Sequence, residues 1–146
     1  MGDARETMDR MTRAMMSQDR AAMAACYAED AVATSPDQGE IRGRDAIGSY
    51  LSQMAEAFPD ARYEPLEQHE AGNVAIDEGY FTGTNTGQIQ MPQGESLPPT
   101  GRELRLRTCD VARVESGLII SHHFYWDQLE FMGQMGLLPE SKPGAP

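Results

Sequence analysis

The stretch RELRLRTCDVARVESGLIISHHFYWD, residues 102–127, decides the fold of this chain. Apolar and polar side chains alternate in its first half, and its second half is rich in β-branched and aromatic residues. A period of two over this length is typical of two long strands. The segment ESG at residues 115–117 separates them, and such a short connection predicts an antiparallel hairpin.

Alternation gives the first of these strands two different faces. One face carries Leu104, Leu106, Thr108, Asp110, Ala112 and Val114. The arginines at positions 105, 107 and 113 point the other way. Asp110 therefore falls on a largely apolar face, where a carboxylate must be paired, hydrogen-bonded or neutral. The alternative is a bulge that turns Asp110 outward to an arginine.

Upstream of the hairpin, the pattern changes from helical to extended. Apolar residues at helical spacing predict helices over residues 3–17, 20–27 and 45–58, the second capped by Asp19 and the third by Asp45. Residues 31–36 and 41–43 read as short strands. Residues 61–72 and 73–87 alternate around a Gly-Asn turn and predict an antiparallel pair. Residues 88–101 hold three prolines and should form a loop, and residues 128–135 a last short helix.

This order of elements, helices first and then a meander of strands, is the α+β pattern. We expect one domain over residues 1–138 and a frayed tail over residues 139–146. Helices packed on one face of a curved, mainly antiparallel sheet can enclose a pocket between the two layers.

Composition excludes several kinds of partner. The chain has 23 acidic and 12 basic residues, a net charge of −11. Without a basic stripe, nucleic acid and anionic membranes are not expected as partners. The charged N-terminus is unlike a signal peptide, and we find no run of eighteen apolar residues, so a cytoplasmic location is expected. Cys26 and Cys109 have no metal-type spacing, and we expect neither a metal nor a cofactor.

The segment HHFYWD, residues 122–127, offers the strongest candidate for chemistry. Alternation puts His123, Tyr125 and Asp127 on one face of the last strand and the residues between them on the other. A carboxylate with two hydrogen-bonding neighbours suits acid/base catalysis, with Asp127 and Asp110 as the catalytic carboxylates and His123 beside them. If both aspartates face one cavity, their pKa values could separate into an acid and a base. Alternatively, Asp127 only caps the helix that follows.

Other residues are candidates for the wall of the pocket. Tyr27, Tyr50, Met54 and Phe58 have helical spacings, so we interpret them first as structural and second as ligand contacts. Asn85 lies between two glycines. It either serves a tight backbone path or orients a substrate carbonyl.

Several segments together resemble the SnoaL-like branch of the nuclear-transport-factor-2-like superfamily, which includes polyketide cyclases. They are YAEDAV (27–32), IRGRDAI (41–47), GTNTG (83–87), LPPTGRELRLRTCDVARVESGLI (97–119) and HFYWDQLEFMGQMGLLP (123–139). The resemblance implies a cone-shaped α+β barrel, usually dimeric, with one deep apolar pocket and no cofactor. It also implies that Asp127 is the general acid/base. Relatives often carry histidine in GTHTG where this chain has Asn85, and asparagine cannot relay a proton near neutrality.

From the resemblance and the residues together, the sequence predicts a small cofactor-free enzyme of the polyketide-cyclase type. Its substrate would be an apolar carbonyl compound, cyclised by an aldol reaction. Related isomerase or epoxide and lactone hydrolase chemistry, or a non-catalytic binding or dimerisation domain, remain alternatives. We expect a homodimer formed through the outer, arginine-bearing face of the sheet.

Overall fold

The computed structural model describes residues 2–91 and 94–139 of the 146-residue chain. Its elements, in chain order, are α1 (Asp3–Met16), α2 (Arg20–Ala25), β1 (Tyr27–Ser35), β2 (Gly39–Arg42), α3 (Arg44–Ala57), β3 (Arg62–Ala71), β4 (Val74–Thr84), β5 (Ile89–Gln90), β6 (Ser96–Leu97), β7 (Glu103–Glu115), β8 (Leu118–Trp126) and α4 (Gln128–Gln134).

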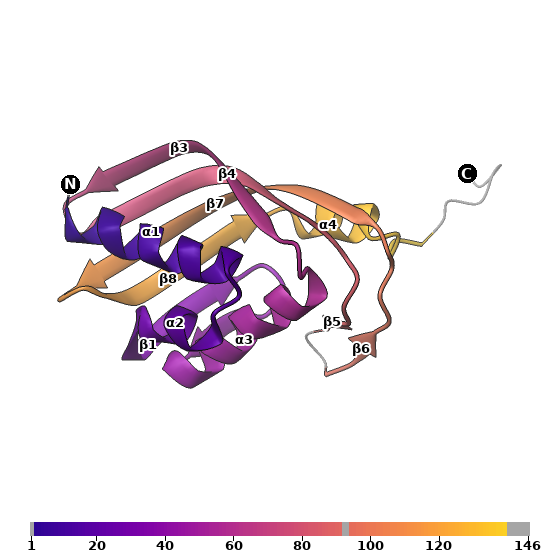
Figure 1. The fold of residues 1–146 in the computed structure, drawn as a ribbon, viewed down its shortest axis with the longest axis horizontal. Helices are drawn as coiled ribbons and strands as arrows, with labels where there is room; N and C mark the ends of the chain where they lie inside the picture. Colours follow the sequence, from indigo (N-terminus) through magenta and orange to yellow (C-terminus); the bar gives the residue numbers. More distant parts are fainter. Residues whose placement is uncertain (1, 92–93, 140–146) are drawn as a thin grey trace.

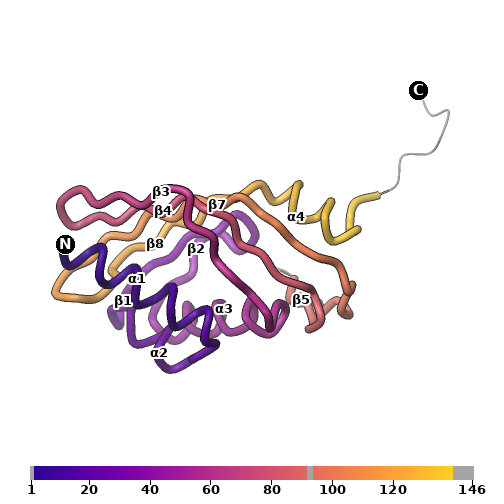
Figure 2. The backbone as a smooth tube through the Cα atoms, turned by 45° about the horizontal axis from the view of Figure 1, so that its top comes forward, coloured from indigo at the N-terminus to yellow at the C-terminus, as the bar shows by residue number. Residues whose placement is uncertain are grey.

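Six of the strands form one curved sheet in the order β2-β1-β8-β7-β4-β3 (Figure 1). Neighbouring strands run antiparallel except β1 and β8, which are parallel. The sheet arches over α1, α2 and α3, which all lie on the same side of it (Figure 2). The predicted α+β architecture, with the N-terminal helices packed over a curved sheet, is therefore confirmed.

The core fills the space between these helices and the concave face of the sheet. Met8 and Met11 of α1 face the sheet, with exposed fractions of 0% and 3%. Met8 and Met11 are thus core residues, whereas Met16 at the end of the helix is exposed. From the sheet side, Ala112 and Ile119 are fully buried against the same cluster.

The predicted hairpin of β7 and β8 is confirmed, and so is its tight turn. Glu115 pairs with Leu118, and the two residues between them have positive φ angles, 52° at Ser116 and 75° at Gly117. Two positive φ angles match the right-handed twist of the flanking strands. On β7 the burial pattern alternates, and the arginines at 105, 107 and 113 are exposed as predicted.

One irregularity in β8 changes which of its side chains face the helices. Arg113 pairs with Ser121 whereas Val114 pairs with Ile119, so Ile120 is an extra residue, a β-bulge. Ile119 and His122 are both fully buried although they are three residues apart. The bulge therefore moves the inward face from odd-numbered to even-numbered positions along the strand.

The structure corrects where two of the predicted helices begin or end. The helix predicted over residues 20–27 ends at Ala25, and Tyr27 already opens β1. Asp19 caps α2 as predicted, by accepting a hydrogen bond from the Ala22 amide at 3.0 Å. Asp45 does not cap α3, because Gly43 occupies that position with a φ of 93°.

Two further predictions concern the C-terminal half. The expected loop over residues 88–101 contains two short paired strands, β5 and β6, and its residues 92–93 lie outside the described part. The predicted frayed tail falls mostly on residues 140–146, which also lie outside the described residues.

Candidate active site

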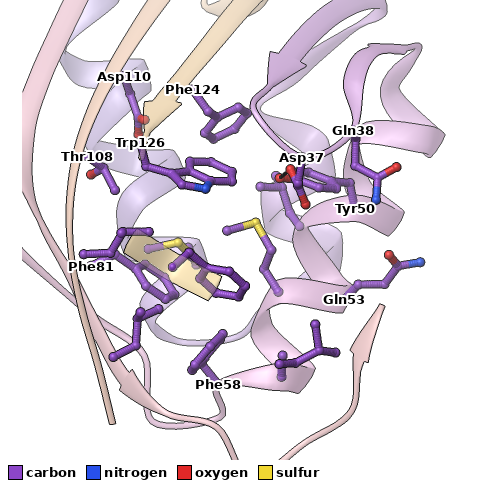
Figure 3. Close-up of a pocket in the computed structure, with 18 of the residues that line it drawn as sticks. Asp37, Gln38, Tyr50, Gln53, Phe58, Phe81, Thr108, Asp110, Phe124 and Trp126 are labelled. Carbon is purple, nitrogen blue, oxygen red and sulfur yellow. Dashed lines mark hydrogen bonds between the residues drawn. The ribbon is translucent and has the colours of Figure 1, made fainter. Parts of the chain in front are cut away.

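A cavity of about 110 Å³ lies between the concave face of the sheet, the C-terminal half of α1, and α3, with β5 and α4 closing its sides. Its walls are mainly apolar and aromatic: Phe58, Phe81, Phe124 and Trp126 all border it (Figure 3). An apolar cavity with a few polar groups is the usual form of a small-molecule site.

Asp110 and Asp37 are the only charged side chains among the described residues that line the cavity. Asp110 projects inward from β7, and its side chain is 17% exposed. Its partners across the sheet are Asp77 on β4 and Phe124 on β8. The sequence prediction that Asp110 lies on the inward face is confirmed, and the alternative of an outward bulge at this position is not observed.

A buried pair of polar side chains lies behind Asp110. The His122 Nε2 atom is 3.7 Å from a carboxylate oxygen of Asp110, and its Nδ1 atom is 2.7 Å from the Tyr27 hydroxyl. Both His122 and Tyr27 have an exposed fraction of 0%. Burial raises the pKa of the Tyr27 phenol well above its usual value, and the charge of Asp110 adds to this shift.

The neighbouring carboxylate, Asp77, has a different environment from Asp110. It is 2% exposed, and its oxygen lies 2.6 Å from the Arg5 guanidinium of α1, which also contacts Asp9 at 2.8 Å. Burial raises the pKa of Asp77, and the bond to Arg5 opposes that shift. Among the described residues, Arg5 carries the one guanidinium that is buried on this face. It binds Asp77 and not Asp110.

The Tyr63 hydroxyl is a further polar group close to Asp77 and Asp110. It is buried and has no hydrogen-bond partner among the described residues, although Tyr63 lines the cavity. A Cβ atom on Gly79 would lie 2.6 Å from this hydroxyl, so the glycine leaves room for the ring. Burial raises the pKa of Tyr63, with the charges of Asp77 and Asp110 adding to the shift, so the phenol keeps its proton for donation.

On the helix side of the cavity, Tyr50 of α3 donates a hydrogen bond to Asp37 at 2.7 Å. Figure 3 shows both residues across the cavity from Asp110. Burial is the main cause that raises the pKa of Tyr50, and Asp37 adds to it. Met54 and Phe58 also line the cavity.

The residues predicted to carry the chemistry on β8 lie elsewhere. His123 and Tyr125 are exposed on the outer face of the sheet, Tyr125 at 53%. Asp127 is exposed too, and it caps α4 by accepting hydrogen bonds from the amides of Leu129 and Glu130 at 2.9 and 3.1 Å. The predicted position of all three in the pocket is wrong, because the bulge at Ile120 turns the other parity inward.

Asn85 and Tyr27 do not line the cavity either. Asn85 is fully buried, and its amide nitrogen donates to the carbonyls of Ala57 and Gly87 at 3.0 and 2.9 Å. Its carbonyl oxygen accepts from the amide and the hydroxyl of Thr100 at 2.7 and 2.8 Å. With its hydrogen bonds made within the protein, Asn85 has none left for a substrate carbonyl.

Sequence reasoning missed His122, Tyr63 and the pairing of Asp77 with Arg5. For His122 a signal was present, because Phe124 and Trp126 share its parity and are more apolar than Tyr125 and Asp127, which have the other parity. Nothing local in the sequence marks Tyr63 or Arg5, since their positions depend on which strands and helices pack together.

The geometry defines a class first: an α+β barrel-like fold of the nuclear-transport-factor-2-like type, with an apolar cavity that contains a carboxylate. A family model described as a SnoaL-like domain matches residues 8–122, and the chain belongs to this family. No curated protein is significantly similar to the sequence.

Solved structures share the fold at low sequence identity. A candidate SnoaL-like polyketide cyclase from Jannaschia sp. CCS1 is 16% identical with a TM-score of 0.80, covering 94% of each chain. The candidate polyketide cyclase IdmH from Streptomyces antibioticus is 23% identical with a TM-score of 0.74, covering 91% of this chain and 98% of its own. A protein with a ketosteroid-isomerase-like fold from Catenulispora acidiphila DSM 44928 is 16% identical with a TM-score of 0.73, and the match covers 94% of this chain and 98% of that protein.

No helix in the described residues is long and apolar enough to cross a membrane. Nor do three or more His, Cys, Asp or Glu side chains in residues 2–91 and 94–139 gather as metal ligands would.

Proposed function

We propose that this protein is a cofactor-free acid/base enzyme of the polyketide-cyclase type, with Asp110 as its general base. The observation that carries the proposal is the position of Asp110. Its carboxylate lies in the wall of an apolar cavity and has no guanidinium partner among the described residues. Carboxylates with this environment are typical of enzymes that abstract protons, because a pure binding site needs few ionisable groups.

In the proposed reaction, Asp110 removes a proton from a carbon next to a substrate carbonyl. The electron pair moves onto the carbonyl oxygen, and a hydrogen bond from a donor in the cavity wall stabilises the enolate that forms. The enolate carbon then attacks a second carbonyl of the same molecule and closes a ring. Asp110 returns its proton to the new alkoxide, so the enzyme ends as it began.

The cavity also restricts the substrate. The charged residues in its described lining, Asp37 and Asp110, are both acidic, so an anionic substrate would be repelled and a neutral one is favoured. Its volume of about 110 Å³ is below the range usual for ligand pockets, roughly 300–1,000 Å³. A flat aromatic ketone of one or two rings suits these walls, and a larger polyketide requires the walls to move apart.

The first half of this reaction can be tested without knowing the natural substrate. We suggest 1-indanone, a flat neutral ketone, in deuterated buffer, with proton NMR to follow deuterium uptake at the carbon next to its carbonyl. The wild-type protein should accelerate uptake, and Asp110→Asn should lose about 10²–10⁴ of that acceleration.

Asp127→Asn is the matched control, because it makes the same chemical change at an exposed helix cap. Asparagine still accepts from the amides of Leu129 and Glu130, so this variant should exchange at the wild-type rate. Equal rates for wild type and Asp110→Asn would refute the role of Asp110. A loss confined to Asp127→Asn would restore the catalytic role that the sequence suggested for that residue.

A further inference from the structure

His122 is a buried ionisable side chain that the proposed reaction does not use. Its exposed fraction is 0%, and its Nε2 atom has no hydrogen-bond partner among the described residues. A buried polar atom without a partner is costly, so such atoms are rare and call for an explanation. A carboxylate oxygen of Asp110 lies 3.7 Å from this atom, just beyond hydrogen-bond distance.

The other nitrogen of the ring determines what Nε2 can do. Nδ1 lies 2.7 Å from the Tyr27 hydroxyl, a short and fully buried contact. If the hydroxyl donates its proton to Nδ1, the imidazole proton is on Nε2 and points towards the carboxylate. In the opposite tautomer, the Nε2 lone pair would face the negative charge of Asp110 with no donor between them. Electrostatics therefore favours the first arrangement.

Packing holds the imidazole in this orientation. The ring stacks on Phe124 with centroids 3.8 Å apart and lies nearly parallel to Tyr27 at 5.9 Å. Phe124 itself borders the cavity and contacts Tyr50 edge-on. Of the two partners only the Asp110 side chain is partly exposed, at 17%, whereas the His122 side chain is not exposed at all.

We propose that His122, oriented by Tyr27, is a positioning residue for Asp110. The inference rests on the proposed function of Asp110. A small rotation of the carboxylate brings one oxygen into hydrogen-bond distance of the Nε2 proton. The other oxygen is then directed into the cavity, where the substrate carbon must present its proton. Tyr27 contributes by fixing the tautomer, and neither residue exchanges a proton with the substrate.

The tautomer can be read directly in the wild-type protein. Protein labelled with nitrogen-15 on histidine gives separate ring signals for the three histidines, and a His122→Gln spectrum assigns the buried one. The proposal expects a protonated Nε2 and an unprotonated Nδ1 at neutral pH. A proton on Nδ1, with or without one on Nε2, would overturn it, and this measurement needs no substrate.

A matched pair of variants tests the consequence for exchange. Tyr27→Phe removes the hydroxyl that fixes the tautomer, whereas Tyr80→Phe removes one that bonds Arg107 on the outer face of the sheet. In the 1-indanone assay, Tyr27→Phe should lower kcat about tenfold with KM unchanged, the scale of one hydrogen bond. Tyr80→Phe should leave both the rate and the His122 signals as in wild type.

The outcomes separate this inference from the proposed function. If wild type catalyses exchange but His122 carries its proton on Nδ1, the role of Asp110 stands and the positioning role fails. If wild type gives no exchange while the nitrogen signals are as expected, the proposed function fails although the tautomer is as inferred. A Tyr27→Phe variant with unchanged kcat would also refute the positioning role.

Discussion

Replacing Asn85 by alanine should destabilise the protein strongly, because this side chain joins three segments of the chain. Its side chain makes four hydrogen bonds, donating two to the carbonyls of Ala57 and Gly87 and accepting two from Thr100; the bond to Ala57 is buried and the other three are partly buried. At roughly 1 kcal/mol for each bond, the loss amounts to about 4 kcal/mol. For a domain of this size that corresponds to a fall in Tm of roughly 8–16 °C.

Urea denaturation followed by circular dichroism measures this loss, with Asn73→Ala as the control. Asn73 carries the same amide, but its side chain makes one exposed contact with Arg113, so its loss should cost less than about 1 kcal/mol. A substrate-orienting Asn85 would behave in the opposite way. Wild-type stability with impaired exchange of 1-indanone would refute the structural role assigned to Asn85.

Three further predictions concern buried charges and phenols. Arg5→Met should lower the free energy of unfolding, measured by urea denaturation, by about 3 kcal/mol, because it leaves Asp77 buried without its guanidinium. Adding Asp77→Leu should recover most of that loss. An unchanged urea midpoint for Arg5→Met would contradict the pairing. Asp110→Leu should raise the free energy of unfolding by about 1 kcal/mol, since it replaces a carboxylate on an apolar wall. A marked decrease in that free energy would mean that Asp110 has a structural role. Burial raises the pKa of Tyr27, Tyr50 and Tyr63, so their contribution to stability is present below the usual phenol pKa of about 10 and is lost as pH rises through their folded values. In an alkaline titration at 295 nm these three of the five tyrosines should ionise only as the protein unfolds, and ionisation in the native state would contradict their burial.

Much of the fold follows from the sequence because its signals are local. Alternation located β3, β4, β7 and β8, and the two-residue turn at Ser116 and Gly117 fixed the hairpin. Helix ends were less accurate: a glycine in a left-handed conformation, Gly43, caps α3 in place of the expected Asp45. Such a position depends on where the preceding strand ends, which residue preferences alone do not determine.

The candidate site was predicted only in part, and one residue explains most of the error. Counting alternate positions along β8 works until Ile120, where the bulge shifts the parity. Odd-numbered residues of β8 face inward before Ile120, and even-numbered residues face inward after it. On β7, which pairs without an irregularity as far as Arg113, the same counting placed Asp110 on the inward face. The single inserted residue, Ile120, therefore turns Asp127 away from the cavity, whereas Asp110 on the partner strand still faces it.

In the proposed function, the two inward aspartates of the sheet have different roles, a structural one for Asp77 and a chemical one for Asp110. Asp77 and Asp110 are cross-strand partners, yet of these two only Asp77 binds the buried guanidinium of Arg5, and the exposed fraction of Asp77 is 2%. Asp110 borders the cavity instead, and the His122 Nε2 atom lies 3.7 Å from its carboxylate. Leaving a carboxylate unpaired on an apolar wall costs stability, and proteins retain such costs mainly where the group has a function. A second arginine in this position would neutralise Asp110 and stabilise the core, but it would also remove the base. The absence of such a cation from the described lining of the cavity is therefore the feature of this fold that most favours catalysis at Asp110.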